Sequence, residues 1–189
     1  MKNTVVASPL SRNKIRQQAL RLRQIFGFDN SMWFPIVEFL EIVLPQVSED
    51  FTFLVLETKE MEEGYGLTIP GDNLISVRED VYERALAGVG RDRFTLAHEL
   101  GHFLLHTSEN VGLTRLPKES STKAYLNPEW QANTFAGELL IPSNLIESKS
   151  VSEISTECGV SLQAAQIQID VLKNAEAVSK MCKKKPPGG

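Results

Sequence analysis

The sequence FTLAHELGHFLLH, residues 94–106, contains all three histidines of the chain: His98, His102 and His106. Its apolar residues recur at helical spacing, so the pattern predicts a helix over about 92–106. His98 and His102 are four residues apart and therefore lie on one helix face, one turn from each other. Two imidazole nitrogens at this spacing can bind one zinc ion at about 2.0–2.1 Å. The stretch therefore predicts a helix that carries a metal site.

Glu99 follows the first of these histidines and completes the pattern HExxH. It is offset by about 100° around the helix from His98, which makes it a poor ligand for the same ion. The position suits a general base that takes a proton from water at the metal. HExxH alone is moderately specific, and two histidines stacked on a solvent-facing helix are the alternative. The apolar opposite face favours the metal site.

A catalytic zinc site needs a third protein ligand and an open fourth position. His106 is a poor candidate, because on a continuous helix it lies about 6 Å beyond His102 along the axis. We expect His106 to be buried, or to support a ligand from behind. Glu129 is the predicted third ligand, twenty-seven residues after His102. The rivals are three other glutamates: Glu109, Glu119 and Glu138.

The segment around Glu129, NPEWQANTFAGELL, predicts a helix with Asn127 as its cap and Pro128 in its first turn. Small residues on the same face allow close packing against another helix. Asn133, one turn after Glu129, is placed to hydrogen-bond the free nitrogen of a ligand histidine. Of the rivals, the first two fall in a loop without a supporting face. Glu138 points away from Glu129.

HELGHFLLH followed by EWQANTFAGELLIP resembles the ImmA/IrrE family of zinc metallopeptidases. VYERALAGVGRDRFTLAHELGH and EISTECGVSLQAAQIQID resemble it too, so the similarity spans roughly residues 70–175. The resemblance implies a gluzincin-like site in which Glu129 joins the two histidines on one Zn²⁺ per chain. It also implies a protein partner, since many members cut a helix-turn-helix repressor of phage, mobile-element or stress genes. Other members belong to toxin–antitoxin pairs.

The remaining pattern predicts an α+β fold, with a small β-sheet packed on helices, and the resemblance implies that this fold is of zincin type. We expect a strand over 51–56, a hairpin of 65–69 with 74–77, and a loop of about twenty residues after the HExxH helix. Further helices are expected over 11–28, from Pro35 to a stop at Pro45, over 79–87 and over 128–140. The expected divisions are an N-terminal helical segment (1–48), a metallopeptidase core (49–142), a C-terminal helical segment of the same domain (143–178) and a disordered basic tail (179–189).

With 189 residues, 42% of them hydrophobic and 23% charged, the chain can form one globular domain with a substantial core. This balance excludes a disordered chain or a disulfide scaffold. The two cysteines, Cys158 and Cys182, form no CxxC pair. No apolar run approaches the ~20 residues of a membrane span, so we expect a cytoplasmic protein without membrane contact.

Charge is distributed unevenly along the chain. Residues 1–28 carry six basic and no acidic residues, whereas residues 29–179 carry ten basic and twenty-four acidic residues, a formal charge of −14. Such an acidic body is a poor general binder of nucleic acid. The segment 152–161 resembles a helix-turn-helix with Gly159 at the turn, but its acidity favours a helical platform. The better candidates to contact DNA or an acidic partner are the arginines of the N-terminal helix: Arg12, Arg16 and Arg23.

These observations together predict a zinc endopeptidase that makes one site-specific cut in a partner protein. A non-cleaving zinc-binding module of a toxin–antitoxin pair is the alternative, and a DNA-binding regulator is less expected. The intact ligands and Glu99 argue against the first of these, and the acidic body argues against the second.

Overall fold

The computed structural model describes residues 4–61, 64–106, 111–114 and 123–183. Its strands are β1 (Thr4–Ala7), β2 (Thr52–Leu56), β3 (Gly66–Ile69), β4 (Leu74–Arg78) and β5 (Val111–Thr114). Its helices are α1 (Arg12–Ile25), α2 (Ile36–Glu38), α3 (Leu44–Val47), α4 (Glu79–Leu86), α5 (Gly90–Leu105), α6 (Pro128–Leu140), α7 (Val151–Cys158) and α8 (Leu162–Lys183). The chain therefore has the α+β fold that the sequence predicts.

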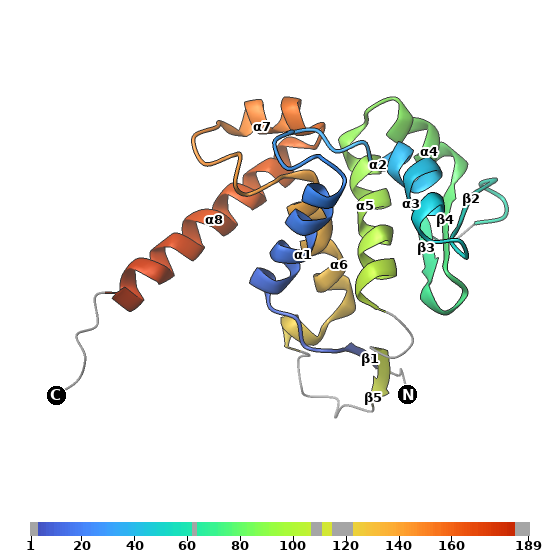
Figure 1. The fold of residues 1–189 in the computed structure, drawn as a ribbon, viewed down its shortest axis with the longest axis horizontal. Helices are drawn as coiled ribbons and strands as arrows, with labels where there is room; N and C mark the ends of the chain where they lie inside the picture. The colour runs from blue at the N-terminus through green and yellow to red at the C-terminus, as the bar shows by residue number, and fades with distance from the viewer. Residues whose placement is uncertain (1–3, 62–63, 107–110, 115–122, 184–189) are drawn as a thin grey trace.

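A mixed sheet of three strands in the order β2–β4–β3 lies on one side of α5 (Figure 1). β3 and β4 form the expected antiparallel hairpin, with Leu67 opposite Ser76, and the turn between them passes through Asn73 at a φ of 50°. β2 pairs with β4 in parallel, with Thr52 opposite Leu74. The buried residues Ile75 and Val77 make β4 the strand that joins the sheet to the core.

α5 is the central helix of the molecule, because it packs against the sheet on one side and against α6 on the other (Figure 1). Leu96 and Leu100 are fully buried in its core-facing surface. The two helices approach closely at Gly101, where a Cβ atom would lie 3.1 Å from Ala132 Cα. The small residues expected between the helices therefore permit this approach, which places residues of α6 within reach of the histidines.

α1 packs on the far side of α6, and its arginines are used inside the fold. Arg23 is fully buried and donates hydrogen bonds to the backbone carbonyls of Phe28, Ser31 and Leu139. Arg16 donates twice to the buried Glu138 at 2.9 and 3.0 Å, and Arg12 lies 3.7 Å from the same carboxylate. The expectation of contact with a partner or DNA is therefore wrong for Arg23, which is buried. The side chains of Arg12 and Arg16 are 31% and 19% exposed, so for them it stays a prediction.

β1 and β5 form a second, two-stranded antiparallel sheet, in which Val5 lies opposite Leu113. The sequence predicts neither strand, and it predicts a loop where β5 lies. Each strand has only four residues, and the partners are more than a hundred residues apart, so local periodicity carries no signal for the pair. The pairing brings the start of the chain next to the segment between α5 and α6.

The helix from Pro35 does not stop at Pro45 as expected. A π-helical turn (Phe39–Val43) precedes the proline, with the Leu44 amide bonded to the Phe39 carbonyl, and the helix resumes as α3. Val43 and Leu44 keep right-handed helical dihedrals, so Pro45 lies inside a continuous helical run. Its missing N–H interrupts the ladder there, directly after the π-helical turn.

α7 and α8 are joined by a turn at Gly159, whose φ is 61°. Ser161 caps α8 by accepting a hydrogen bond from the Ala164 amide at 3.1 Å. α8 extends to Lys183, well past the expected end at Val178, so the expectation of a disordered tail is wrong for residues 179–183. The rest of that tail lies outside the described residues. Among the residues described, no helix has the length and apolarity to cross a membrane.

Candidate active site

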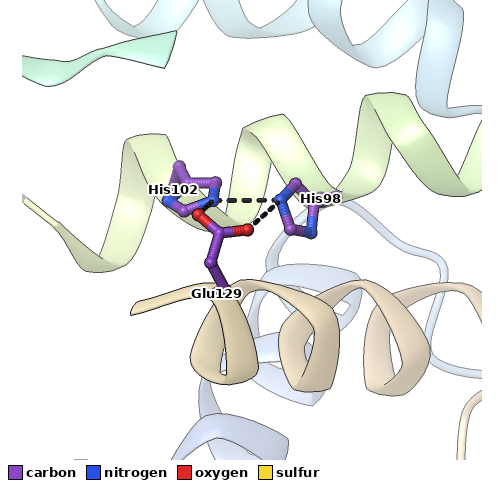
Figure 2. A group of neighbouring side chains, drawn as sticks. All are labelled: His98, His102 and Glu129. Atoms are coloured by element: carbon purple, nitrogen blue, oxygen red, sulfur yellow. Dashed lines mark hydrogen bonds and ion pairs between the residues drawn. The ribbon is translucent and has the colours of Figure 1, made fainter. Parts of the chain in front are cut away.

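α5 presents His98 and His102 on the face that looks toward α6. Their Nε2 atoms lie 3.0 Å apart. Figure 2 shows the two rings side by side above Glu129. The arrangement follows from the fold of the helix, because burial of Leu96 and Leu100 turns the histidine face away from the main core. Both rings remain partly accessible, with side-chain exposures of 17% and 18%.

The first turn of α6 brings Glu129 to the two histidines. Asn127 caps this helix by accepting hydrogen bonds from the amides of Glu129 and Trp130, at 2.9 and 3.3 Å. The Glu129 carboxylate oxygens lie 3.4 Å from His98 Nε2 and 3.3 Å from His102 Nε2. The Glu129 side chain is 66% exposed, so this side of the cluster is open to solvent.

The three groups fit a metal ion. Ligand atoms of a tetrahedral zinc site lie roughly 3.3 Å apart, because each is about 2.0–2.1 Å from the ion. The observed separations of 3.0, 3.3 and 3.4 Å are close to this value. Within the described part of the chain, these three residues form the cluster of potential ligands. Of the rivals, Glu138 is buried against Arg16, and Glu109 and Glu119 lie outside the described residues.

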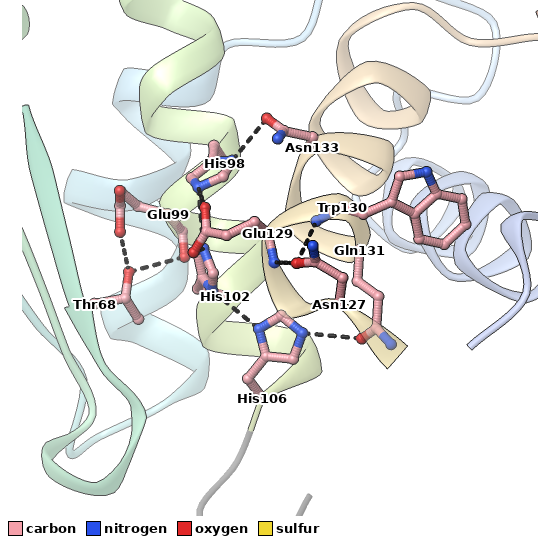
Figure 3. Close-up of polar contacts among 10 residues, drawn as sticks. All are labelled: Thr68, His98, Glu99, His102, His106, Asn127, Glu129, Trp130, Gln131 and Asn133. Carbon is pink, nitrogen blue, oxygen red and sulfur yellow. Dashed lines mark hydrogen bonds and ion pairs between the residues drawn. The ribbon is translucent and has the colours of Figure 1, made fainter. Parts of the chain in front are cut away.

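The second nitrogen of each histidine also has a partner (Figure 3). His98 Nδ1 lies 3.0 Å from Asn133 Oδ1, and His102 Nδ1 lies 3.0 Å from His106 Nδ1. The structure thus brings Asn133 and His106 into contact with the candidate ligands. α5 ends at Leu105, and His106 leaves the helical path with φ −120° and ψ 56°, so its ring meets the back of His102.

Glu99 lies on the sheet side of the histidines and is 7% exposed. Thr68 on β3 donates a hydrogen bond from its hydroxyl to Glu99 Oε2 at 2.6 Å. Burial raises the pKa of the Glu99 carboxyl, while the Thr68 hydrogen bond and the nearby His98 act in the opposite direction. The side chain therefore combines a raised proton affinity with a fixed orientation, as a general base requires.

Two residues of β3 determine the surroundings of Glu99, and neither could be recognised from the sequence. Besides Thr68, Gly66 leaves the space that Glu99 occupies, because a Cβ there would lie 2.7 Å from Glu99 Cγ. The sequence signal was only the hairpin itself, since the packing of β3 against α5 is a tertiary feature.

Burial lowers the pKa of His102 to about 4, and the adjacent His98 acts in the same direction. Burial lowers the pKa of His106 as well. Both effects favour neutral imidazole near pH 7, which is the form that binds metal.

Two histidines one turn apart, a glutamate from a second helix and a buried carboxylate beside them define a metallopeptidase type of site. A family model described as the IrrE N-terminal-like domain, of the peptidase M78 class, matches residues 56–170. The chain belongs to this ImmA/IrrE metallopeptidase family, as the motifs indicated, and it is an enzyme of that kind. A comparison with curated proteins finds no match.

Proposed function

We propose that the protein is a zinc-dependent endopeptidase with a gluzincin-type site on a zincin-type fold. One Zn²⁺ is held by His98, His102 and Glu129, and the observation that carries the proposal is the convergence of their ligand atoms. Two neutral imidazoles and one carboxylate suit zinc, whereas magnesium and calcium prefer oxygen ligands. Asn133 and His106 support the two histidines from behind.

Zinc bound by such a set polarises a carbonyl group and lowers the pKa of water toward 7. Glu99 then takes one proton as the water oxygen attacks the carbon of the scissile peptide bond. The same carboxyl gives this proton to the amide nitrogen as the C–N bond breaks, which leaves a carboxylic acid and an amine. Thr68 holds Glu99 in place during both transfers.

The substrate is a protein, and we propose that it is cut once, at one site, rather than degraded. A helix-turn-helix repressor of a phage, a mobile element or a stress response is the proposed partner, on the basis of the family resemblance. The pair α7–α8 serves as a helical platform and does not read DNA. Residues 151–177 carry four acids and one lysine, so this segment attracts phosphate poorly.

The replacement Glu99→Gln tests this function, because it keeps the shape of the side chain and removes the base. General acid–base groups contribute about 10²–10⁴-fold, and we expect a loss near the upper end. The product of the adjacent gene, if that gene encodes a repressor, is incubated with wild type and variant, with zinc and with a chelator. Only the zinc-loaded wild type should cut it, although the variant should bind zinc and partner equally.

Cleavage by Glu99→Gln at the normal rate would rule out this mechanism. A zinc-loaded wild type that binds its partner but never cuts it would instead favour the non-cleaving module of a toxin–antitoxin pair.

A further inference from the structure

Gln131 is a fully buried glutamine directly behind His106. It is neither a candidate ligand nor a neighbour of Glu99, so it has no role in the site as described above. It lies on α6, two residues after Glu129, but its side chain points to His106 and not to the candidate ligands (Figure 3). Its oxygen Oε1 lies 2.9 Å from His106 Nε2. The side chain thus ends a chain of contacts that begins at the candidate ligand His102.

The orientation of the Gln131 amide is determined by two backbone carbonyls. Nε2 donates to the Ser8 carbonyl at 2.9 Å and to the Tyr125 carbonyl at 2.7 Å. A backbone carbonyl only accepts hydrogen bonds, so both hydrogens of the amide group are engaged there. Turning the amide over would place its oxygen against two other oxygens. Gln131 Oε1 must therefore face His106 and act as an acceptor.

This constraint propagates through two rings. Since Gln131 Oε1 accepts, His106 Nε2 must carry a hydrogen, and in the neutral ring His106 Nδ1 then has only a lone pair. His102 Nδ1, 3.0 Å from that lone pair, must in turn donate. Neutral His102 is then left with its lone pair on Nε2, the atom that faces Glu129 and His98.

We infer that Gln131 is a positioning residue that sets the tautomers of His106 and His102, and so keeps the Nε2 lone pair of His102 directed at the metal. The inference rests on the proposed metal site but does not depend on peptide cleavage. Both Gln131 and His106 are buried, at 0% and 4% exposure, so bulk water has no access to replace a lost partner.

The same chain of contacts gives the N-terminal segment a role in the site. Ser8 lies between β1 and α1, and the Tyr125 carbonyl also accepts a hydrogen bond from the Leu10 amide at 3.0 Å. The segment that follows β1 therefore supplies one of the two acceptors that hold the Gln131 amide in one orientation.

The tautomers can be measured directly in the metal-free protein. Long-range ¹H–¹⁵N correlation spectra of histidine-labelled protein, at neutral pH, distinguish a hydrogen on Nδ1 from one on Nε2. We expect His106 with its hydrogen on Nε2 and His102 with its hydrogen on Nδ1. The opposite tautomer on either ring in the wild-type protein would overturn the inference without any variant.

The variant Gln131→Met removes both the acceptor and the donors while keeping the length of the side chain. We expect mixed tautomers on His106 and a zinc affinity about tenfold weaker, at the lower end of the 10–100-fold range for outer partners of ligands. Gln168→Met is the matched control, because Gln168 is also buried, at 3% exposure, and its Nε2 has no hydrogen-bond partner among the described residues. It should change neither quantity.

A double-mutant cycle separates positioning from general stability. If Gln131 acts through His106, then Gln131→Met should add little to the loss of zinc affinity in His106→Ala. Additive losses, or an equal loss in Gln168→Met, would overturn the inference. These readouts need no substrate, so a protein that binds zinc in this way but cuts nothing would contradict only the proposed endopeptidase.

Discussion

The two candidate histidine ligands are supported by very different surroundings. His98 is backed by Asn133, an exposed side chain on α6 whose amide can be hydrated and can turn over. His102 is backed by His106 and then Gln131, both buried, and this chain ends on two backbone carbonyls. The His98 arm of the site, His98 with Asn133, is thus open to water. The His102 arm, His102 with His106 and Gln131, is held by the protein interior.

Equal spacing on one helix therefore does not make the two candidate ligands equivalent. An exposed partner can be replaced by water at small cost, whereas a buried partner leaves unsatisfied polar groups when it is removed. We therefore expect the His102 arm to determine how strongly the site is organised before metal arrives. The His98 arm should adjust more freely.

The largest effect should come from removing a ligand, which affects both arms alike. His98→Ala, His102→Ala and Glu129→Ala each leave two protein ligands and should lose nearly all zinc, because a catalytic zinc site needs three. Elemental analysis of the purified proteins, with about one zinc per wild-type chain as the reference, measures this. Full zinc occupancy in Glu129→Ala would remove it as the third ligand.

A replacement on α6 that contacts neither arm should lower the free energy of unfolding and leave the zinc content unchanged. Glu138→Ala leaves Arg16 without its buried partner and should cost about 3 kcal/mol of unfolding free energy. Glu157→Ala is the control, since its ion pair with Lys149 is at the surface and should contribute less than about 1 kcal/mol. Denaturant unfolding of both variants makes the comparison, with zinc content unchanged.

The direct test of the asymmetry is to remove the partner behind each histidine. His106→Ala should weaken zinc binding by about 10–100-fold yet keep most of the metal at saturating zinc, because the three ligands remain. Asn133→Ala should weaken it less, since water can take the place of the exposed amide. Competition with a chelator measures both affinities. Equal losses would show that burial of the partner does not matter.

The smallest effect should come from losing the hydrogen bond that Thr68 donates to Glu99, since neither residue belongs to an arm. Thr68→Val removes the hydroxyl at nearly constant shape, and the lost hydrogen bond to the carboxylate should lower kcat/KM about tenfold, equivalent to about 1.4 kcal/mol. Zinc affinity should stay the same, and Thr68→Ser should restore most of the activity. A loss of zinc in Thr68→Val would place the threonine in the metal site instead.

The parts of this protein that depend on local periodicity could be predicted from the sequence. Helical spacing puts His98 and His102 on one face, and the Asn127–Pro128 start places Glu129 in the first turn of its helix. Small residues on α6 indicated that this helix packs closely against another, which is α5. These inferences succeed because one turn of a helix has nearly the same geometry in every protein.

The residues that reach the candidate site from distant parts of the chain could not be predicted, because their positions depend on packing between elements. Thr68 and Gly66 reach Glu99 because β3 packs on α5, and Ser8 reaches Gln131 because β1 pairs with β5 across the chain. The sequence groups three arginines on α1, but only the structure shows that Arg23 is buried and that Arg16 pairs with Glu138. Charge and residue type are visible in a sequence, but burial and pairing over a hundred residues follow from the cooperative packing of the whole fold.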